Sequence, residues 1–167
     1  MHRVTDDGWP EGAPGPVANV RRALTAAGLR DTVTVLPGKV PTAAAAAAAL
    51  KCDVAAITNS LIFELEGAPL LILASGAARV DTRYVASQLG SGRIRRADPD
   101  FVLAHTGQEV GGVAPVGHPK KIRTLLDASL EEYDTLWAGA GDHHSMFSIS
   151  YGELLRVTAA QVLQVRW

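Results

Sequence analysis

The strongest constraint on the fold is a pair of β-rich segments separated by a short turn. Residues 54–65 are rich in β-branched and large apolar side chains, and the four residues 66–69, Glu-Gly-Ala-Pro, have the composition of a turn. The chain then returns through an apolar segment, Leu70–Ala74. Two such segments around a turn predict an antiparallel β-hairpin.

Further helices and strands are expected on both sides of this hairpin. Apolar spacing and capping residues predict helices over 17–29, 43–49, 82–89, 98–105 and 151–157. In the second of these, Thr42 caps a run of seven alanines, whose small side chains let a helix lie close to a sheet. Strands are expected at 33–36, 93–96, 122–126, 135–140 and 145–150.

The order of these elements predicts the fold class. Strands and helices mix without strict βαβ alternation, which indicates a single compact α/β (α+β) domain. Its mixed, partly closed sheet or barrel would be surrounded by helices. Residues 1–16 hold three prolines and three glycines and are predicted to be a flexible lead-in, so the domain would span 17–167.

Composition limits the classes of function. Of the 167 residues, 47% are hydrophobic and 20% charged, as in a soluble globular protein. The formal net charge of −1 gives no global basic field, so any RNA contact must come from a local patch. The single cysteine, Cys52, excludes an internal disulfide and fits a reducing compartment. No apolar run is long enough to span a membrane, and the N-terminus lacks a signal-peptide pattern, so a cytoplasmic protein is expected.

A glycine-rich segment at 106–118 is the main candidate for chemistry. It contains four glycines, Pro115 and His118 between two core-like segments. Glycines allow positive φ and leave no Cβ between the backbone and a ligand, and Pro115 stiffens the loop. Such a loop can direct successive N–H groups at one spot, forming an oxyanion site. From spacing alone, an ordinary turn between strands is the alternative.

Several motifs, in this order, resemble the YbaK/ProX family, the free-standing relatives of the prolyl-tRNA synthetase editing domain. They cover roughly residues 41–158 and comprise Ile57–Phe63, Leu70–Gly76 with Arg79–Asp81, Arg95–Phe101, the Gly-x-x-x-Pro element of the glycine loop, and Trp137–Gly141 through Phe147. The resemblance implies the fold expected above and hydrolysis of a misacylated tRNA ester.

The family's chemistry implies roles for individual residues. Backbone groups of Gly111 and Gly112 would hold the ester carbonyl, and Pro115 would fix the loop, with Val113 and Ala114 beside the substrate. Water and a ribose hydroxyl of the tRNA would replace a protein nucleophile. One oxyanion donor contributes about 2.7–4 kcal/mol. No cofactor and no metal are implied, and the partners would be the acceptor end of an aminoacyl-tRNA and an aminoacyl-tRNA synthetase, with no DNA and no membrane.

Asn59 departs from the family pattern. Many relatives have a lysine at this place, just before the Ser/Thr-Leu pair that is Ser60-Leu61 here. Asparagine can donate and accept hydrogen bonds but carries no charge. Either Asn59 orients the substrate, or activity is weakened or lost, or Asn59 is a polar residue that satisfies the strand backbone.

The remaining polar residues have competing interpretations. His118 could act as an acid or base, or brace the loop by bonding backbone. The sequence Asp142-His143-His144 suggests a metal site, but adjacent histidines in a strand would point to opposite faces. One of them could line the pocket instead. Thr58, Ser60 and Ser145 have no triad partners, so none of them is predicted to be a nucleophile. Ser60 is predicted to line the pocket or to bond backbone, and Ser145 to contact the substrate. Lys120, Lys121 and Arg79 are predicted to contact phosphate, the lysines most strongly because they flank the loop.

The sequence thus predicts an aminoacyl-tRNA deacylase that acts in trans on misacylated tRNA of the prolyl class. One alternative is a non-catalytic module that binds aminoacyl-tRNA or another adenosine ester. The other is an esterase for a small ester unrelated to tRNA.

Overall fold

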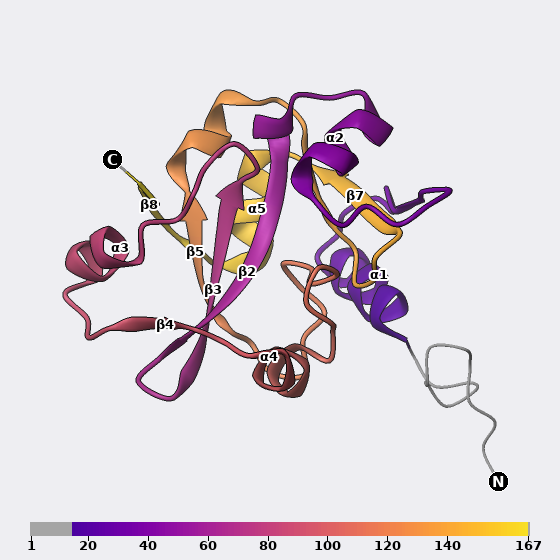
Figure 1. Ribbon diagram of the computed structural model, residues 1–167. Coiled ribbons are helices and arrows are strands. Elements are labelled where there is room, and N and C mark those ends of the chain that lie inside the picture. Colours follow the sequence, from indigo (N-terminus) through magenta and orange to yellow (C-terminus); the bar gives the residue numbers. More distant parts are fainter. Residues whose placement is uncertain (1–14, 167) are drawn as a thin grey trace, which may run out of the picture.

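The computed structural model describes residues 15–166 (Figure 1). The predicted lead-in 1–16 lies outside the described residues except for its last two positions. The first helix, α1 (Pro16–Ala26), begins with a proline in its first turn, where the missing N–H costs nothing.

The core of the fold is one mixed sheet. Its strands lie in the order β1 (Thr34–Val35), β7 (Ser145–Ile149), β6 (Leu136–Gly139), β2 (Ile57–Leu65), β3 (Ala68–Ser75), β5 (Arg123–Asp127) and β8 (Gln161–Leu163), and β4 (Ile94–Arg96) also pairs with β2. The pairs β2–β6, β3–β5 and β5–β8 are parallel and the others antiparallel. The predicted mixed α/β domain is therefore confirmed; the described strands leave the sheet open, with β1 and β8 at its ends.

The predicted hairpin is the pair β2–β3 at the centre of the sheet. Its turn is shorter than expected, because Leu65 already pairs with Ala68. Only Glu66 and Gly67 remain in the turn, both at positive φ (54° and 83°), as in the tight turns that suit strand twist. Five consecutive residues of β3, Leu70–Ala74, are almost fully buried, which explains their unbroken apolar sequence.

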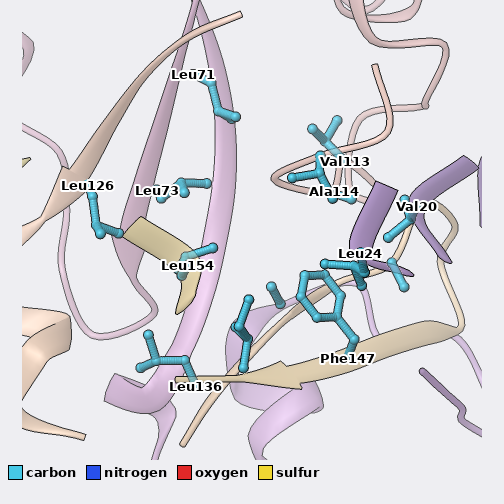
Figure 2. Packing of buried hydrophobic residues seen from close by; sticks show 14 of the residues in the cluster. Val20, Leu24, Leu71, Leu73, Val113, Ala114, Leu126, Leu136, Phe147 and Leu154 are labelled. Atoms are coloured by element: carbon cyan, nitrogen blue, oxygen red, sulfur yellow. The ribbon is translucent and has the colours of Figure 1, made fainter. Parts of the chain in front are cut away.

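Helices and loops cover both faces of this hairpin. On one face, Leu71 and Leu73 pack in the largest hydrophobic cluster with side chains from α1, α4 (Pro99–Thr106), α5 (Tyr151–Thr158) and the glycine loop. Figure 2 shows Val113 and Ala114 of the loop in this cluster, on the side of Val20. On the other face, Leu70 and Ile72 pack against α3 (Thr82–Leu89).

The predicted helix boundaries are largely confirmed. The side chains of Thr42, Asp81 and Asp98 accept hydrogen bonds from backbone N–H groups at the starts of α2 (Ala43–Leu50), α3 and α4. The alanine helix α2 buries Ala46 and Ala47 beside Ile57 of β2, as expected for a helix that lies close to a sheet. The sequence analysis missed the short strand β8 and two 3₁₀ turns, Val54–Ala56 and Ala128–Glu132.

One edge of β2 is paired only at its ends. The N-terminal end, at Ile57 and Thr58, pairs with β6, and the C-terminal end, from Phe63 to Leu65, pairs with β4. Between them this edge has no neighbouring strand among the described residues. We call this interruption, residues 59–62, the β2 gap.

Candidate functional site

The β2 gap opens onto a cavity of about 930 Å³. The middle of β2, residues 57–63, forms its floor. The glycine loop contributes Val110, Gly111 and Val113, and Arg79 and Arg96 also line it. The cavity therefore brings together the two sequence motifs from which the site was predicted, although they are about fifty residues apart in the sequence.

Ser60 offers backbone hydrogen-bonding groups to this cavity. The C=O of Ile57 accepts from the N–H of Gly76 at 2.7 Å, so odd-numbered residues of β2 bond to β3. In an antiparallel pair the N–H and C=O of the even-numbered residues then point to the opposite edge. Ser60 lies in the gap of that edge, so both of its backbone groups lack a strand partner there.

Two buried hydroxyl groups add to this polarity. The Oγ1 of Thr58 and the Oγ of Ser60 have no hydrogen-bond partner in the described part of the protein, and both residues line the cavity. An unsatisfied buried hydroxyl reduces the free energy of unfolding by about 1–3 kcal/mol, so these two groups destabilise the fold. This is the pattern expected of a binding site rather than of a core.

Asn59 and Ser60 approach the cavity from opposite faces of the sheet. Asn59 lies opposite Ala74, on the face of α3, whereas Ser60 lies opposite Leu73, on the face of the glycine loop. Arg79, in the connection between β3 and α3, also lines the cavity. No aspartate or glutamate is among the described residues that line the cavity, so its fixed charge is positive.

Gly111 is the part of the glycine loop best placed for chemistry. It is exposed, has φ +88°, and lines the cavity. Within the described residues its N–H forms no hydrogen bond. Val113, also in the lining, has a free N–H by the same criterion.

The predicted role of Gly112 does not fit this geometry. Its N–H donates to the C=O of Glu109 at 2.9 Å, so the group is already used inside the loop. A Cβ at this position would lie 3.0 Å from backbone atoms of Asp142. Gly112 is therefore a close-packing residue that lets the loop touch the segment before β7, and the second free donor is the N–H of Val113.

Gln108 holds the loop in shape and was missed by the sequence analysis. Its side chain is almost fully buried, accepts from the N–H of Ala114 at 2.8 Å, and donates to the C=O of Val116 at 3.3 Å. Buried Thr106 supports it, since its hydroxyl accepts from the Gln108 N–H at 2.9 Å. The buried Gln108 amide satisfies two backbone groups of the loop and so fixes the loop conformation. In the sequence, only the neighbouring Gly-x-x-x-Pro element indicated that Gln108 lies in a shaped loop.

The position of His118 fits a residue that braces the loop by bonding to its backbone. Its Nε2–H donates to the C=O of Ala114 at 2.8 Å, and the ring does not line the cavity. Burial lowers the pKa of His118, because the charged ring would lose its hydration, and the bond to Ala114 offsets only part of this effect. The neutral ring is thus favoured as a donor to the loop.

Other predicted substrate contacts lie away from the cavity. Ala114 and Pro115 are buried within the loop and do not line the cavity, and Ser145 is buried where β7 pairs with β1. Lys121 lines a separate depression of about 370 Å³ beside α5 and β8, and exposed Lys120 lines neither. The structure therefore groups Arg79, not the two lysines, with Asn59, Ser60, Gly111 and Val113.

The two adjacent histidines are not in a strand. His143 and His144 lie in the turn that precedes β7, where the Oδ1 of Asp142 accepts from the N–H groups of His144 and Ser145. The expectation that the two side chains point to opposite faces of a strand is therefore wrong for His143 and His144. The described residues contain no group of three or more histidine, cysteine or acidic side chains that could hold a metal ion.

Comparison with known proteins identifies the class of domain that this fold and cavity define. The sequence profile described as "Aminoacyl-tRNA editing domain" matches residues 38–157, which include the β2 gap and the glycine loop. The chain belongs to this family, as the sequence motifs indicated. None of the described helices is long and apolar enough to cross a membrane.

Similar proteins support this assignment. The chain is 30% identical over 145 residues to the uncharacterized protein YwhH of Bacillus subtilis, covering 86% of this chain and 92% of YwhH. It is 27% identical over 84 residues to a proline–tRNA ligase of Citrifermentans bemidjiense, covering half of this chain and 15% of the ligase. Its fold matches a crystal structure of a candidate trans-editing enzyme for prolyl-tRNA synthetase with a TM-score of 0.85 and 35% identity, over 91% and 97% of the two chains.

Proposed function

We propose that the protein is a cytoplasmic aminoacyl-tRNA deacylase that acts in trans and hydrolyses the ester of a misacylated tRNA. The observation that carries the proposal is the N–H of Gly111, which has no hydrogen-bond partner in residues 15–166 and lies at the wall of a cavity in an editing-domain fold. The prolyl class of tRNA is favoured by the similarity to a proline–tRNA ligase and to a candidate trans-editing enzyme for prolyl-tRNA synthetase.

The proposed mechanism needs no protein nucleophile. The acceptor end of the tRNA enters the cavity, and the N–H groups of Gly111 and Val113 donate to the ester carbonyl oxygen. Negative charge develops on this oxygen when water, aided by a hydroxyl of the terminal ribose, attacks the carbonyl carbon. Fixed backbone donors stabilise that charge without reorganisation, which is the largest single contribution in many acyl-transfer sites. The products are the free amino acid and the tRNA with its ribose hydroxyl restored.

The cavity polarity suggests how the rest of the substrate is held. Asn59 supplies hydrogen bonds, and Arg79, which lines the same cavity, supplies positive charge for a phosphate of the acceptor end. Ser60 supplies its hydroxyl on the loop side and its backbone groups at the edge of β2.

The test is amino-acid release from a panel of mischarged tRNAs by the wild type and by Gly111→Ala. A side chain at φ +88° is strained, and its Cβ would lie 3.3 Å from the ring of His143, so the N–H would move. We expect Gly111→Ala to reduce single-turnover hydrolysis by about 100-fold, as for one lost oxyanion donor.

Gly90→Ala is the matched control. Gly90 also has positive φ (63°), but it ends α3 and a Cβ there meets nothing within 4 Å. Both variants should lose some stability, and only Gly111→Ala should lose activity. Normal turnover by Gly111→Ala would remove the loop from the reaction.

Asn59 keeps a second candidate function open, namely a non-catalytic module that binds aminoacyl-tRNA. The specific observation is that position 59 holds an uncharged asparagine, where the resemblance to the family implies a lysine. The same panel separates the two: retention of aminoacyl-tRNA on a filter without release of amino acid by the wild type supports the module. Hydrolysis of small esters with indifference to tRNA supports the esterase instead.

A further inference from the structure

The turn before β7 contacts the glycine loop directly. The Oδ1 of Asp142 fixes this turn by accepting two N–H groups, at 2.9 and 2.8 Å. Gly112 packs on the backbone of Asp142 so closely that a Cβ would be 3.0 Å away. The position of the turn therefore determines where the glycine loop can lie.

His143, at the centre of this turn, links two walls of the cavity. Its backbone carbonyl oxygen accepts from the N–H of Val40 at 3.0 Å, and Val40 lines the cavity. Its ring Nε2–H donates to the Oε2 of Glu109 in the glycine loop at 3.2 Å. The Cε1 atom of the same ring would lie 3.3 Å from a Cβ on Gly111, so the ring lies against the Cα of that glycine.

We propose that His143 is a positioning residue for the deacylation reaction, and that it acts through Gly111. This inference rests on the proposed function, because it assigns to His143 the task of orienting the N–H that receives the ester oxygen. Gly111 has no side chain and no hydrogen bond from its N–H in the described residues, so nothing in its own chemistry selects one orientation. Contact with a ring that Glu109 holds in place restricts the backbone there.

The partly exposed setting of His143 makes the proposal testable. Its side chain is 32% exposed, so its truncation leaves little cavity in the core. The backbone bond to Val40 does not depend on the side chain and survives substitution. Loss of the ring should therefore disturb Gly111 without unfolding the protein.

His144 provides a control of identical chemistry one residue away. Its backbone carbonyl oxygen accepts from the N–H of Leu36 at 2.8 Å, and within the described residues its ring forms no hydrogen bond or ion pair. The structure shows no interaction of the His144 ring with Glu109 or Gly111. His144→Ala should thus reproduce every nonspecific effect of removing a histidine from this turn.

The first measurement is single-turnover deacylation of one mischarged tRNA as a function of enzyme concentration. We expect His143→Ala to lower the maximal rate about 10-fold and to change the half-saturating concentration less than twofold. His143→Gln, whose amide can still donate to Glu109, should recover part of the rate, and His144→Ala should match the wild type. Equal maximal rates for His143→Ala and His144→Ala would overturn the proposal.

The second measurement needs no substrate and separates this inference from the proposed function. In ¹⁵N-labelled protein, the amide signal of Gly111 should shift and exchange faster with solvent in His143→Ala, but not in His144→Ala. If the wild type hydrolyses no tRNA, the proposed function fails, while a changed Gly111 amide still supports the positioning role. An unchanged Gly111 amide in His143→Ala would overturn that role even in an active enzyme.

Discussion

At the scale of single residues, the glycine loop depends on a neutral histidine. His118 donates to the C=O of Ala114, and burial lowers the pKa of the ring below its ordinary value of 6.5. The unfolded protein therefore takes up the proton at a higher pH than the folded protein does. By linkage, the contribution of His118 to stability is complete above pH 6.5 and is lost as the pH falls from there towards the folded-state pKa.

This predicts a specific effect of His118→Gln, whose amide can donate to the same carbonyl but does not titrate. The free energy of unfolding of the wild type should fall more steeply than that of the variant as the pH decreases below 6.5. Urea unfolding of both proteins between pH 5 and 8 measures the difference, and the remaining histidines cancel because both proteins carry them. Parallel curves would show that His118 does not titrate differently on unfolding.

At the scale of elements, α5 has the most complete helix start among the described helices. The Ser150 hydroxyl accepts from the N–H of Glu153, and the Glu153 carboxylate accepts from the N–H of Ser150. These bonds lower the pKa of Glu153 from its ordinary 4.5. The carboxylate thus stabilises the fold above pH 4.5, and this contribution is lost as the pH falls through the lowered folded-state pKa.

Ser150→Ala should therefore reduce the free energy of unfolding at pH 7 by about 1 kcal/mol. The deficit should shrink in acid, because the Ser150 hydroxyl stabilises the charged Glu153 carboxylate and this part of its contribution is lost when Glu153 is protonated. Ser87→Ala, at an exposed position inside α3, is the control and should cost nothing, since alanine favours helix interiors. Chemical denaturation at pH 7 and pH 3 tests both statements, and a deficit independent of pH would show that the Ser150 hydroxyl does not stabilise the Glu153 carboxylate.

The elements themselves were largely predictable, because their signals are local. A capping side chain with apolar residues at helical spacing defined α2, α3 and α4, and two apolar segments around a turn defined β2–β3. The strand β8 was missed because three residues carry no periodicity, and its pairing with β5 depends on residues far away in the sequence. Gln108 and His143 were not assigned their contacts for the same reason, since the loop's own sequence does not show which backbone groups surround it.

At the scale of the whole molecule, the site is electropositive although the net charge is −1. Arg79 and Arg96 line the cavity without an ion pair to the described residues. Lys120 and Lys121, which the sequence favoured because they follow the loop, lie elsewhere. The chain turns away from the cavity after His118 to enter β5, which places the two lysines apart from the two arginines.

The salt dependence of tRNA binding should reflect this arrangement. Replacing Arg79 and Arg96 with alanine should weaken binding of all tRNAs and reduce the slope of log affinity against log salt by about 0.7 for each phosphate of a single strand that is no longer neutralised. Lys120→Ala with Lys121→Ala is the charge-matched control and should leave the slope unchanged. Filter binding between 50 and 200 mM salt, about the range where such phosphate interactions dominate, measures both. The opposite result would place the tRNA on the lysine side.

The β2 gap has a consequence for motion as well as for binding. Among the described strands, only β3 pairs with β2 at Ser60, whereas the two ends of β2 are held on both edges, by β3 together with β6 or β4. Fewer hydrogen bonds must break for the middle of β2 to move than for either end. The most deformable part of the central strand thus adjoins the cavity, while its clamped ends keep the two sides of the sheet in register.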